Sequence, residues 1–280
     1  MIIIFNWMSK SIIIFGANGM LGKYITKYLN MKNIFHILKI TRNDIDVSNS
    51  TYDDLIKLLI AYKNAIVINC IGKIPQRTDR KQTELKQYFR INSLFPQLLY
   101  LACKETENKL IHITTDCVFS GSKGKYLEND EHDETGVYGI SKSLGEPHQA
   151  CIIRTSIIGE EIDNKKSLLE WVIGQNNSTI KGFKNHYWNG VTCLELAKII
   201  LFMLTHNILW EGVRHIYTPV PVSKYELIKN IIEVYNLKIE LICEDTDLVD
   251  KTLSSHYDPI IKIQDILQQL NELKLFKLNT

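Results

Sequence analysis

SIIIFGANGMLGKYITKYL, residues 11–29, joins a run of β-branched and aromatic residues to a glycine-rich turn and then to a segment with helical spacing. The continuous apolar run predicts a buried parallel strand over residues 11–15, followed by a helix. Gly16, Gly19 and Gly22 carry no Cβ, so the backbone can turn tightly and approach a pyrophosphate at the helix N-terminus. The stretch therefore predicts a dinucleotide-binding turn; the alternative is a glycine turn that binds nothing.

Strands and helices alternate along the chain beyond this stretch. Further strands are expected at residues 36–40, 65–70, 110–114 and 151–155, and helices at 20–29, 53–62, 83–104 and 138–150. Because each right-handed crossover between parallel strands needs a helix, this order predicts an α/β fold with a doubly wound parallel sheet of the Rossmann type. After residue 158 the pattern loosens, with helices expected at 168–173, at 193–205, from 223 and from 260, and a strand at 214–217.

This change of pattern predicts two domains. Residues 1–158 would form the dinucleotide-binding Rossmann domain, to which residues 187–217 return. Residues 159–186 and 218–280 would form a smaller C-terminal lobe that binds the substrate. Ligands of such sheets bind in the crevice at the carboxyl ends of the strands, so we expect the lobe to cover that edge.

Composition limits the classes of partner. The 280 residues are 45% hydrophobic and 23% charged, with a formal net charge of +2, which is typical of a globular chain and not of a nucleic-acid binder. No apolar run approaches the roughly 20 residues of a membrane span and no secretory signal is recognisable, so we expect a cytoplasmic protein with neither nucleic acid nor membrane as partner. The six cysteines form no CxxC pair and have no histidine at zinc-ligand spacing. Reduced thiols and no metal site are therefore expected.

The residues after the second expected strand bear on the choice of cofactor. Sheets of this type that bind NAD carry an acidic residue about 20 residues beyond the glycine turn. Thr41 and Arg42 occupy that place, and a guanidinium there favours the 2′-phosphate of NADP(H). Asp44 and Asp46 lie close enough to leave NAD(H) open. We assign the cofactor to Gly16, Asn18, Gly19, Met20, Leu21, Arg42 and Asp46.

A second motif is Tyr138-Gly-Ile-Ser-Lys142, which places a phenol and an ammonium on one helical face. A Tyr and Lys pair of this spacing is common by itself. Here Thr114-Thr115-Asp116 ends the preceding strand, and the glycine turn comes first in the chain. This order of parts is hard to obtain by chance.

With these motifs the chain resembles the extended short-chain dehydrogenase/reductases, and among them the dTDP-4-dehydrorhamnose reductases, over residues 11–217. The family's features appear as Gly16 to Gly22, Asp44-Ile45-Asp46-Val47, Asn69, Ile91-Asn92, Thr114 to Phe119, Tyr126-x-Glu128, Val137-Tyr138-Gly139 with Lys142, Gly145-Glu146 and Arg154-Thr155-Ser156. The resemblance implies that Thr115 orients a carbonyl, that Tyr138 donates a proton, and that Lys142 lowers the tyrosine pKa while it holds the nicotinamide ribose. It also places Asn69 and Gly72 at the cofactor. The chemistry agrees, because a phenol of pKa ~10 needs a neighbouring cation to work near neutral pH.

Cys117 departs from the bacterial rhamnose reductases, which usually carry tyrosine after the Thr-Asp pair. Cysteine at this place resembles the bifunctional 3,5-epimerase/4-reductases, including GDP-fucose synthase and the plant-type enzyme that makes UDP-rhamnose. The resemblance implies that Cys117 exchanges protons at the carbons beside the ketone. Those carbons are acidified by the carbonyl, and a thiol of pKa ~8.5 is readily tuned as a base. The alternative is a small buried residue that fills the place of the tyrosine.

An epimerase of this kind also needs an acid on the opposite face of the sugar. Relatives supply it as His or Lys after the strand that ends near residue 156, so we expect Lys166 in this role, with Lys165 beside it and His186 as a weaker candidate. Each of the three also fits an ordinary solvated or packed side chain. Substrate contacts are expected from Arg77, Asp116 and Thr192.

The leading prediction is an NADP-dependent nucleotide-sugar 3,5-epimerase/4-reductase that converts a UDP- or dTDP-linked 4-keto-6-deoxyhexose to the L-rhamnose nucleotide. Two alternatives stay open: a 4-reductase without epimerase, and a non-catalytic Rossmann module that resembles the regulatory subunit of methionine adenosyltransferase. Thr115, Tyr138 and Lys142 together argue against the second, because a binding module need not keep a proton-relay set. The expected partner is a nucleotide-sugar substrate, and a homodimer is left open.

Overall fold

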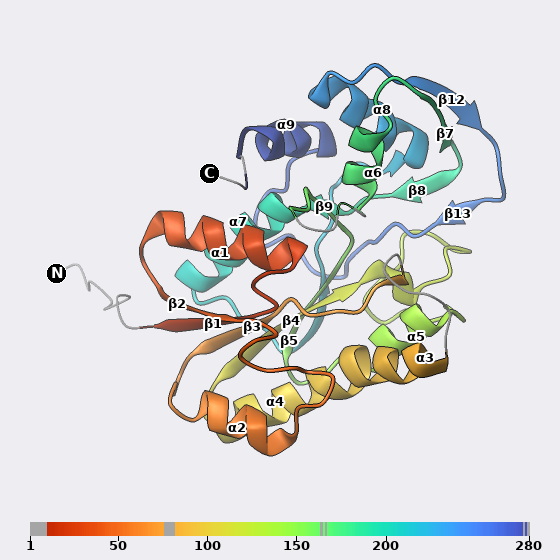
Figure 1. Ribbon diagram of the computed structural model, residues 1–280. Helices are drawn as coiled ribbons and strands as arrows, with labels where there is room; N and C mark the ends of the chain where they lie inside the picture. Colours follow the sequence, from red (N-terminus) through yellow and green to blue (C-terminus); the bar gives the residue numbers. More distant parts are fainter. Residues whose placement is uncertain (1–9, 76–81, 163–164, 166, 277, 279–280) are drawn as a thin grey trace.

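One parallel sheet organises the computed structural model, which describes residues 10–75, 82–162, 165, 167–276 and 278. Within these residues the sheet has six strands in the order β10-β5-β4-β3-β1-β2 (Figure 1). Their bounds are β1 Ser11–Phe15, β2 His36–Ile40, β3 Ile66–Asn69, β4 Lys109–Thr115, β5 Cys151–Thr155 and β10 Gly212–His215. Every neighbouring pair is parallel. The α/β fold with a doubly wound parallel sheet is confirmed.

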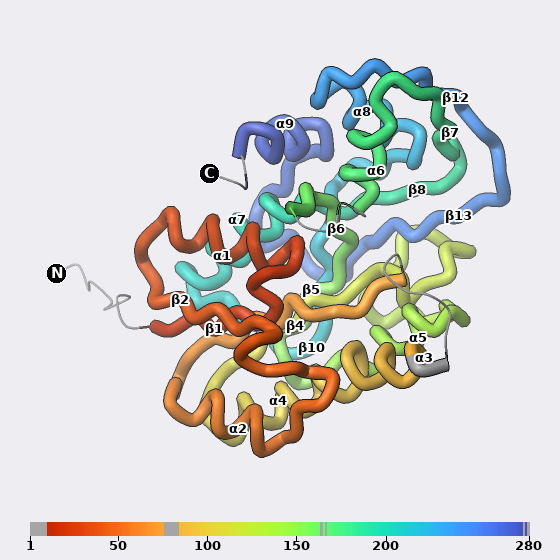
Figure 2. Tube along the Cα trace, viewed as in Figure 1, coloured from red at the N-terminus to blue at the C-terminus, as the bar shows by residue number. Residues whose placement is uncertain are grey.

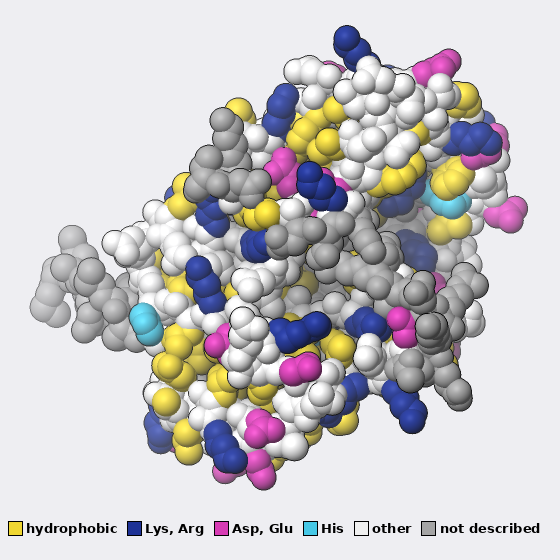
Figure 3. Space-filling model, in the orientation of Figure 1, with side chains coloured by type: hydrophobic (Ala, Val, Ile, Leu, Met, Phe, Trp, Pro, Cys, Tyr) yellow, Lys and Arg dark blue, Asp and Glu magenta, His cyan; other side chains and the backbone are white. Residues whose placement is uncertain are grey.

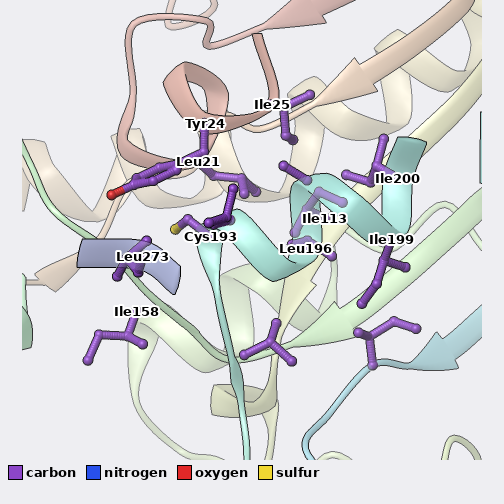
Figure 4. Packing of buried hydrophobic residues seen from close by; sticks show 14 of the residues in the cluster. Leu21, Tyr24, Ile25, Ile113, Ile158, Cys193, Leu196, Ile199, Ile200 and Leu273 are labelled. Atoms are coloured by element: carbon purple, nitrogen blue, oxygen red, sulfur yellow. The ribbon is translucent and has the colours of Figure 1, made fainter. Parts of the chain in front are cut away.

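Helices cover both faces of the sheet. They are α1 Met20–Lys32 and α7 Cys193–Thr205 on one face, and α2 Tyr52–Leu59 and α4 Phe95–Glu105 on the other. Because successive strand side chains point to opposite faces, Ile12 belongs to the first core and Ile13 to the second. Figure 4 shows the first core, where Tyr24 of α1 lies beside Cys193 of α7 and Leu196 of α7 lies beside Ile113 of β4. With both faces covered, the strands need apolar residues at every position, which explains the unbroken run at residues 11–15.

The strand order reverses beside β1. β2 pairs with one edge of β1 and β3 with the other, so successive crossovers leave in opposite directions. In open sheets of this kind ligands bind outside the carboxyl ends of the strands at the point of reversal. The glycine turn follows β1, and the loop after β3 begins next to it, so both lie at this edge.

Further elements gather into a lobe at one end of the molecule, apart from α2 and α4 (Figures 1 and 2). Its helices are α6 Leu168–Gly174, α8 Lys224–Tyr235 and α9 Ile266–Phe276. Its short strands are β7 Thr179–Phe183 with β12 Glu240–Glu244, and β8 His186–Trp188 between β11 Val222–Ser223 and β13 Val249–Asp250. β6 Ile157–Ile158 pairs with β9 Val191–Thr192. These strands are too short for their alternation to stand out in the sequence.

Two long helices expected from the sequence are divided in the structure. The segment expected at 83–104 consists of α3 Gln82–Tyr88, a π-helical turn at Phe89–Leu94, and α4. The helix expected at 138–150 is α5 Val137–Ser143 and ends seven residues early. It ends there because Pro147 has no N–H to donate to the Ser143 carbonyl and disfavours a helical residue before it. Smaller corrections concern β10, which begins and ends two residues before the expected 214–217, and α9, which starts six residues after 260.

No helix in the described part of the chain is long and apolar enough to cross a membrane. Over the same residues, no group of three or more His, Cys, Asp or Glu side chains is arranged to hold a metal ion. On the face shown in Figure 3, Lys and Arg side chains are interspersed with Asp and Glu. That face carries no continuous basic stripe of the kind that tracks a nucleic-acid backbone.

Candidate active site

The glycine turn forms a close-packed cradle at the start of α1. Gly16 has a left-handed φ of 77°, and a Cβ there would lie 2.9 Å from Ile71 Cγ1. A Cβ on Gly22 would collide with the Gly16 carbonyl oxygen. Asn18 and Gly19 are exposed at the mouth of the turn. The first turn of α1 has neither a side-chain cap nor an acidic residue, so its N–H groups suit the pyrophosphate of a dinucleotide.

The loop after β2 gives the two acidic candidates and Arg42 different surroundings. Asp44 accepts hydrogen bonds from the Thr41 N–H and hydroxyl, both 2.8 Å, so its carboxylate closes the turn locally. Hydrogen bonds from Ser48, together with the charge of Arg42, lower the pKa of the Asp46 carboxyl. Arg42 is exposed, and its guanidinium is available to a phosphate group.

Asn69 and Gly72 lie at the end of β3 and in the loop that follows it, and their expected cofactor contacts stay a prediction. Asn69 is fully buried, its Nδ2 lies 3.0 Å from His112 Nδ1, and its Oδ1 accepts the Ile71 N–H at 3.0 Å. The amide therefore shapes the turn after β3. A Cβ on Gly72 would meet only Asn92 Oδ1, at 3.8 Å, so packing does not require glycine there.

Asn92, in the π-helical turn, joins three segments beneath the site. Its Oδ1 accepts the Lys73 N–H at 2.8 Å, and its Nδ2 donates to the Lys73 carbonyl and to Ser141 Oγ, both at 3.0 Å. The loop after β3 and α5 are thereby held together. π-Helical turns are frequent at functional sites, and this one accounts for Asn92 among the motif residues.

Thr115, Tyr138 and Lys142 come together where β4 ends. Thr115 is the last residue of β4, and its hydroxyl lies close enough to the Tyr138 phenol to affect the pKa of that phenol. Lys142 lies one turn further along α5 and donates to the Ile113 carbonyl at 3.1 Å. The chain thus holds a hydroxyl, a phenol and an ammonium side by side at the carboxyl edge of the sheet.

The electrostatics of this group differ from expectation. Burial raises the pKa of the Tyr138 phenol, and the neighbouring Cys117 and Asp116 add to the effect. Burial also lowers the pKa of Lys142 to about 8. The expectation that Lys142 lowers the tyrosine pKa is not met, because its ammonium is bonded to the Ile113 carbonyl and desolvation dominates.

Cys117 lies in the 3-10 turn Asp116–Val118 that follows β4. Its N–H donates to Thr115 Oγ1 at 3.1 Å, and its Sγ lies 3.6 Å from Asp116 Oδ1. Burial, followed by the Asp116 charge, raises the pKa of the thiol to about 12. The expected place beside Thr115 is therefore found, but the expected ease of ionisation is not.

Two lysines of the C-terminal lobe face this turn, and the sequence did not reveal either. Lys224 begins α8, and its Nζ lies 5.8 Å from the centre of the Trp188 ring. Lys251 follows β13 and forms an ion pair with Glu134 at 2.9 Å. Glu134 also accepts the N–H of Gly136, the residue that caps α5. More than a hundred residues separate both lysines from β4, and no spacing signal in the sequence links them to it.

The remaining sequence candidates are dispersed. Arg77 and Lys166 lie outside the described residues. Lys165 is exposed with a left-handed backbone, and the His186 ring packs on Phe183 at 4.7 Å and bonds Thr246 Oγ1. Thr192 is 1% exposed and caps α7 by accepting the Glu195 N–H. Its expected substrate contact is not supported, because the hydroxyl is used inside the protein.

A second buried cluster surrounds Arg154 in β5, which pairs with Thr114 of β4. Arg154 of β5 is 1% exposed and forms two hydrogen bonds with Glu146, of 2.7 and 3.2 Å. His132 and His215 contact the same guanidinium at 2.8 and 2.9 Å, and the Phe119 ring stacks against it. The guanidinium is thus surrounded by partners on all sides.

Comparison with known families and proteins shows which sequences this chain resembles. A family model described as "RmlD substrate binding domain" matches residues 10–251. The dTDP-4-dehydrorhamnose reductase of Aggregatibacter actinomycetemcomitans is 25% identical, over 90% of this chain and 87% of that protein. The spore coat polysaccharide biosynthesis protein SpsK of Bacillus subtilis is 22% identical, over 84% of this chain and 83% of its own length.

Solved structures share the fold. The dTDP-4-dehydrorhamnose reductase of Bacillus anthracis, crystallised in complex with NADP, superposes with a TM-score of 0.82 at 21% identity and covers 96% of this chain and 100% of its own. A GDP-L-fucose synthetase from Naegleria fowleri gives a TM-score of 0.72 at 12% identity, over 97% of this chain and 93% of its own. Similarity at these identities shows a common architecture.

Proposed function

Since the chain belongs to the RmlD substrate binding domain family, we propose that it is an NADP(H)-dependent oxidoreductase that reduces the 4-keto group of a nucleotide-linked 4-keto-6-deoxyhexose. The observation that carries the proposal is the proximity of the Thr115 hydroxyl to the Tyr138 phenol, with Lys142 one turn further along α5. These groups lie at the edge of the sheet where the glycine turn offers a pyrophosphate site.

The residues fit a reduction in which a proton is delivered to the ketone oxygen. Thr115 and Tyr138 would hold that oxygen between their hydroxyl groups, as donors aimed at a developing oxyanion. Because burial raises the pKa of Tyr138, the phenol carries its proton at neutral pH and can donate it. Lys142, with a pKa of about 8, is mostly protonated at pH 7 and can supply the proton that the phenol gives up. NADPH, when bound at the cradle of Gly16 and Gly22, would supply the hydride to C4.

The exposed guanidinium of Arg42 favours NADP(H) over NAD(H). The carboxylates of Asp44 and Asp46 accept hydrogen bonds from Thr41 and Ser48. Each carboxylate is therefore already used within the loop, which weakens the case for a contact with the ribose hydroxyls of NAD(H). Arg42 keeps donors free for a 2′-phosphate, to which a guanidinium forms charge-assisted hydrogen bonds.

The finer proposal is that the protein also epimerises C3 and C5 and so forms the L-rhamnose nucleotide from a UDP- or dTDP-linked substrate. Cys117 supports it, because its N–H bonds to Thr115 Oγ1 and its thiol therefore lies beside the group that would hold the ketone. Because the pKa of the thiol is raised, Cys117 holds its proton at neutral pH. The thiol must therefore transfer that proton to a base before it can act on the sugar as a thiolate. A reductase without epimerase is the alternative.

The reductase proposal and the epimerase proposal can be tested in one experiment. The pure protein is incubated with UDP- or dTDP-4-keto-6-deoxyglucose and NADPH in heavy water, and the sugar is identified by NMR. We expect an L-sugar nucleotide with deuterium at C3 and C5, since each enolisation draws deuterium from solvent whereas hydride transfer does not. NADPH oxidation without deuterium would leave a simple reductase, and no oxidation with any 4-keto sugar would overturn the reductase proposal.

Cys117→Ser isolates the epimerase step. We expect it to stop deuterium entry at C3 and C5, because a hydroxyl is far less acidic than a thiol. Reduction of a sugar that has already been epimerised should continue. The matched control is Cys243→Ser, which alters an exposed cysteine of the lobe and should change neither step. Normal deuterium entry in Cys117→Ser would remove the cysteine from the mechanism.

A further inference from the structure

Inversion of a carbon beside a ketone requires two proton-transfer groups, because a single base returns the proton to the face from which it came. The structure shows where the first would be, at Cys117. Lys165 is exposed, His186 is bonded to Thr246 in the lobe, and Lys166 lies outside the described residues. The structure leaves the role of Lys166 untested, and the side chains that face the Cys117 turn offer a further candidate for the second group.

Lys224 is held toward that turn by the start of α8. Ser223 caps the helix by accepting the Glu226 N–H at 3.1 Å, and the Glu226 carboxylate accepts the Ser223 N–H at 2.7 Å. This reciprocal capping box fixes the backbone of Lys224, the first helical residue. Its ammonium lies 5.8 Å from the centre of the Trp188 ring, and Trp188 is buried in β8. The Lys224 ammonium therefore lies near the buried Trp188, in the lobe strand β8.

The Lys224 ammonium has no hydrogen bond or ion pair with the residues that the structure describes. The charged and polar groups that it faces are Asp116 and Cys117. Burial lowers the pKa of Lys224, against the opposing effect of those two groups. A half-buried cation without a bonded partner is costly, and such groups are concentrated at functional sites.

Lys251, the other lysine at this turn, is differently placed. Its ammonium is bonded to Glu134 at 2.9 Å. Against the effect of burial, that bond raises the pKa of Lys251. Lys251 therefore holds its proton and ties the lobe to the start of α5. Of the two lysines, only Lys224 keeps its donors free for a substrate.

We propose that Lys224 is the proton partner of Cys117 in the epimerisation, an inference that rests on the epimerase part of the proposed function. The Cys117 thiolate takes the proton from C3 or C5, and the electrons of the broken C–H bond form the enolate, whose oxygen is O4. The Lys224 ammonium then gives a proton to the same carbon from the other face, and the C4 carbonyl forms again. The step leaves a thiol and a neutral amine, and the proton returns from sulfur to nitrogen through solvent. No oxidant or reductant is consumed.

Lys224→Met tests the proposal in heavy water with a 4-keto-6-deoxyglucose nucleotide and no NADPH. We expect inversion at C3 and C5 to fall by about 10²-fold or more, the typical contribution of a positioned acid. Deuterium should still enter those carbons with the original configuration retained, because the Cys117 thiol exchanges with solvent and returns a deuteron to the same face. Lys224→Arg should behave like Lys224→Met, since a guanidinium keeps the charge but does not release a proton.

Lys229→Met is the matched control, because Lys229 is exposed on the same helix. It should invert the sugar like the unmodified protein. Reduction of an already epimerised 4-keto sugar, followed by its KM and kcat, separates proton transfer from binding. We expect the loss of inversion in Lys224→Met to exceed any loss of reduction by at least about 30-fold, within the range of a general acid.

Three outcomes would overturn the role of Lys224. Normal inversion by Lys224→Met would exclude it, and rescue by Lys224→Arg would reduce it to a charge that binds substrate. An equal rise in KM for both reactions would assign it to the diphosphate. These results differ from failure of the proposed function, in which the unmodified protein itself would give neither inversion nor deuterium exchange.

Discussion

Arg154 and Lys142 are both buried cations close to the end of α5, yet their surroundings differ. Arg154 is bonded twice to Glu146 and contacts two histidines and an aromatic ring. Lys142, 4% exposed, donates one hydrogen bond, to the Ile113 carbonyl. Burial lowers the pKa of Lys142 to about 8. The saturated cation holds the structure together, whereas the poorly bonded one keeps a proton that can be moved.

This contrast also orders the other charged groups. Lys251, bonded to Glu134, resembles Arg154, and Lys224, which faces Asp116 without a hydrogen bond, resembles Lys142. Counting the partners of each buried cation therefore separates the groups that we assign to structure from those that we assign to chemistry. The following changes test that separation, starting with the largest expected effect.

Tyr138→Phe should abolish most of the reduction while the protein stays folded. It removes the proton donor of the poorly bonded region, and a positioned acid contributes about 10²–10⁴-fold. The measurement is kcat for NADPH-dependent reduction of the 4-keto sugar, beside the thermal midpoint. Tyr100→Phe, whose phenol bonds Gln149 outside the site, should keep its activity. Near-normal turnover by Tyr138→Phe would place the chemistry elsewhere.

Arg154→Met should have the opposite effect to Tyr138→Phe, because its main result should be a lower free energy of unfolding. It leaves the Glu146 carboxylate buried without its main partner, and breaking such a pair costs about 3–5 kcal/mol. Urea unfolding measures the effect. The control is Lys63→Met, which breaks the exposed ion pair with Glu107 and should cost less than about 1 kcal/mol. Similar losses in the two variants would contradict the comparison.

Lys142→Met should stabilise the protein at pH 7 although it removes activity. The folded-state pKa of about 8 lies below the ordinary 10.5, so the cost of burying the ammonium is fully present below pH 8. Between pH 8 and 10.5 the folded state releases the proton while the unfolded state keeps it, and the cost disappears. A shift of this size corresponds to about 3 kcal/mol.

Urea unfolding of this variant at pH 7, 9 and 10 tests the sign. The gain should shrink as the pH rises, and the lost bond to Ile113 should offset part of it throughout. Lys104→Met, an exposed lysine of α4, should show no such trend. A gain that is constant with pH would mean that Lys142 is not titrating in this range.

Arg42→Ala should give the smallest effect, because this cation is exposed. We expect the preference for NADPH over NADH to narrow by about tenfold, the value of one charged hydrogen bond. Fluorescence titration with both cofactors measures it, and Lys39→Ala, an exposed cation of β2, serves as control. Equal affinities in the unmodified protein would instead exclude NADP(H) selectivity.

The sequence predicted those features that depend on neighbouring residues. The apolar run at 11–15, the glycine turn and the alternation of strands and helices determine the doubly wound sheet locally. Thr115, Tyr138 and Lys142 could be placed together because each lies at the end of a strand or on the helix that follows it. Parallel strands bring such positions to one edge.

Features that depend on distant packing were missed. Nothing in the sequence near Lys224 or Lys251 indicates that the lobe brings them to Cys117, more than a hundred residues away. The close packing of Gly145, just after α5, on the Asn92 carbonyl oxygen is a contact that no helix propensity reports. The pKa values of Tyr138 and Cys117 depend on how far the site is desolvated, and a residue's type does not disclose that.

β10 lies next to β5 at the edge of the sheet, although residues 156–211 separate the two strands. α7, within the same interval, covers the apolar side of α1. At about 5–20 residues per second of synthesis, α1 leaves the ribosome roughly nine to thirty-five seconds before the end of α7 does, and its apolar face is exposed throughout that time. The edge of β5 stays unpaired for a shorter period, roughly three to twelve seconds at the same rate, until β10 has been made. The growing chain is therefore most prone to aggregate in this interval, and chaperones are most needed before residue 215 has been made.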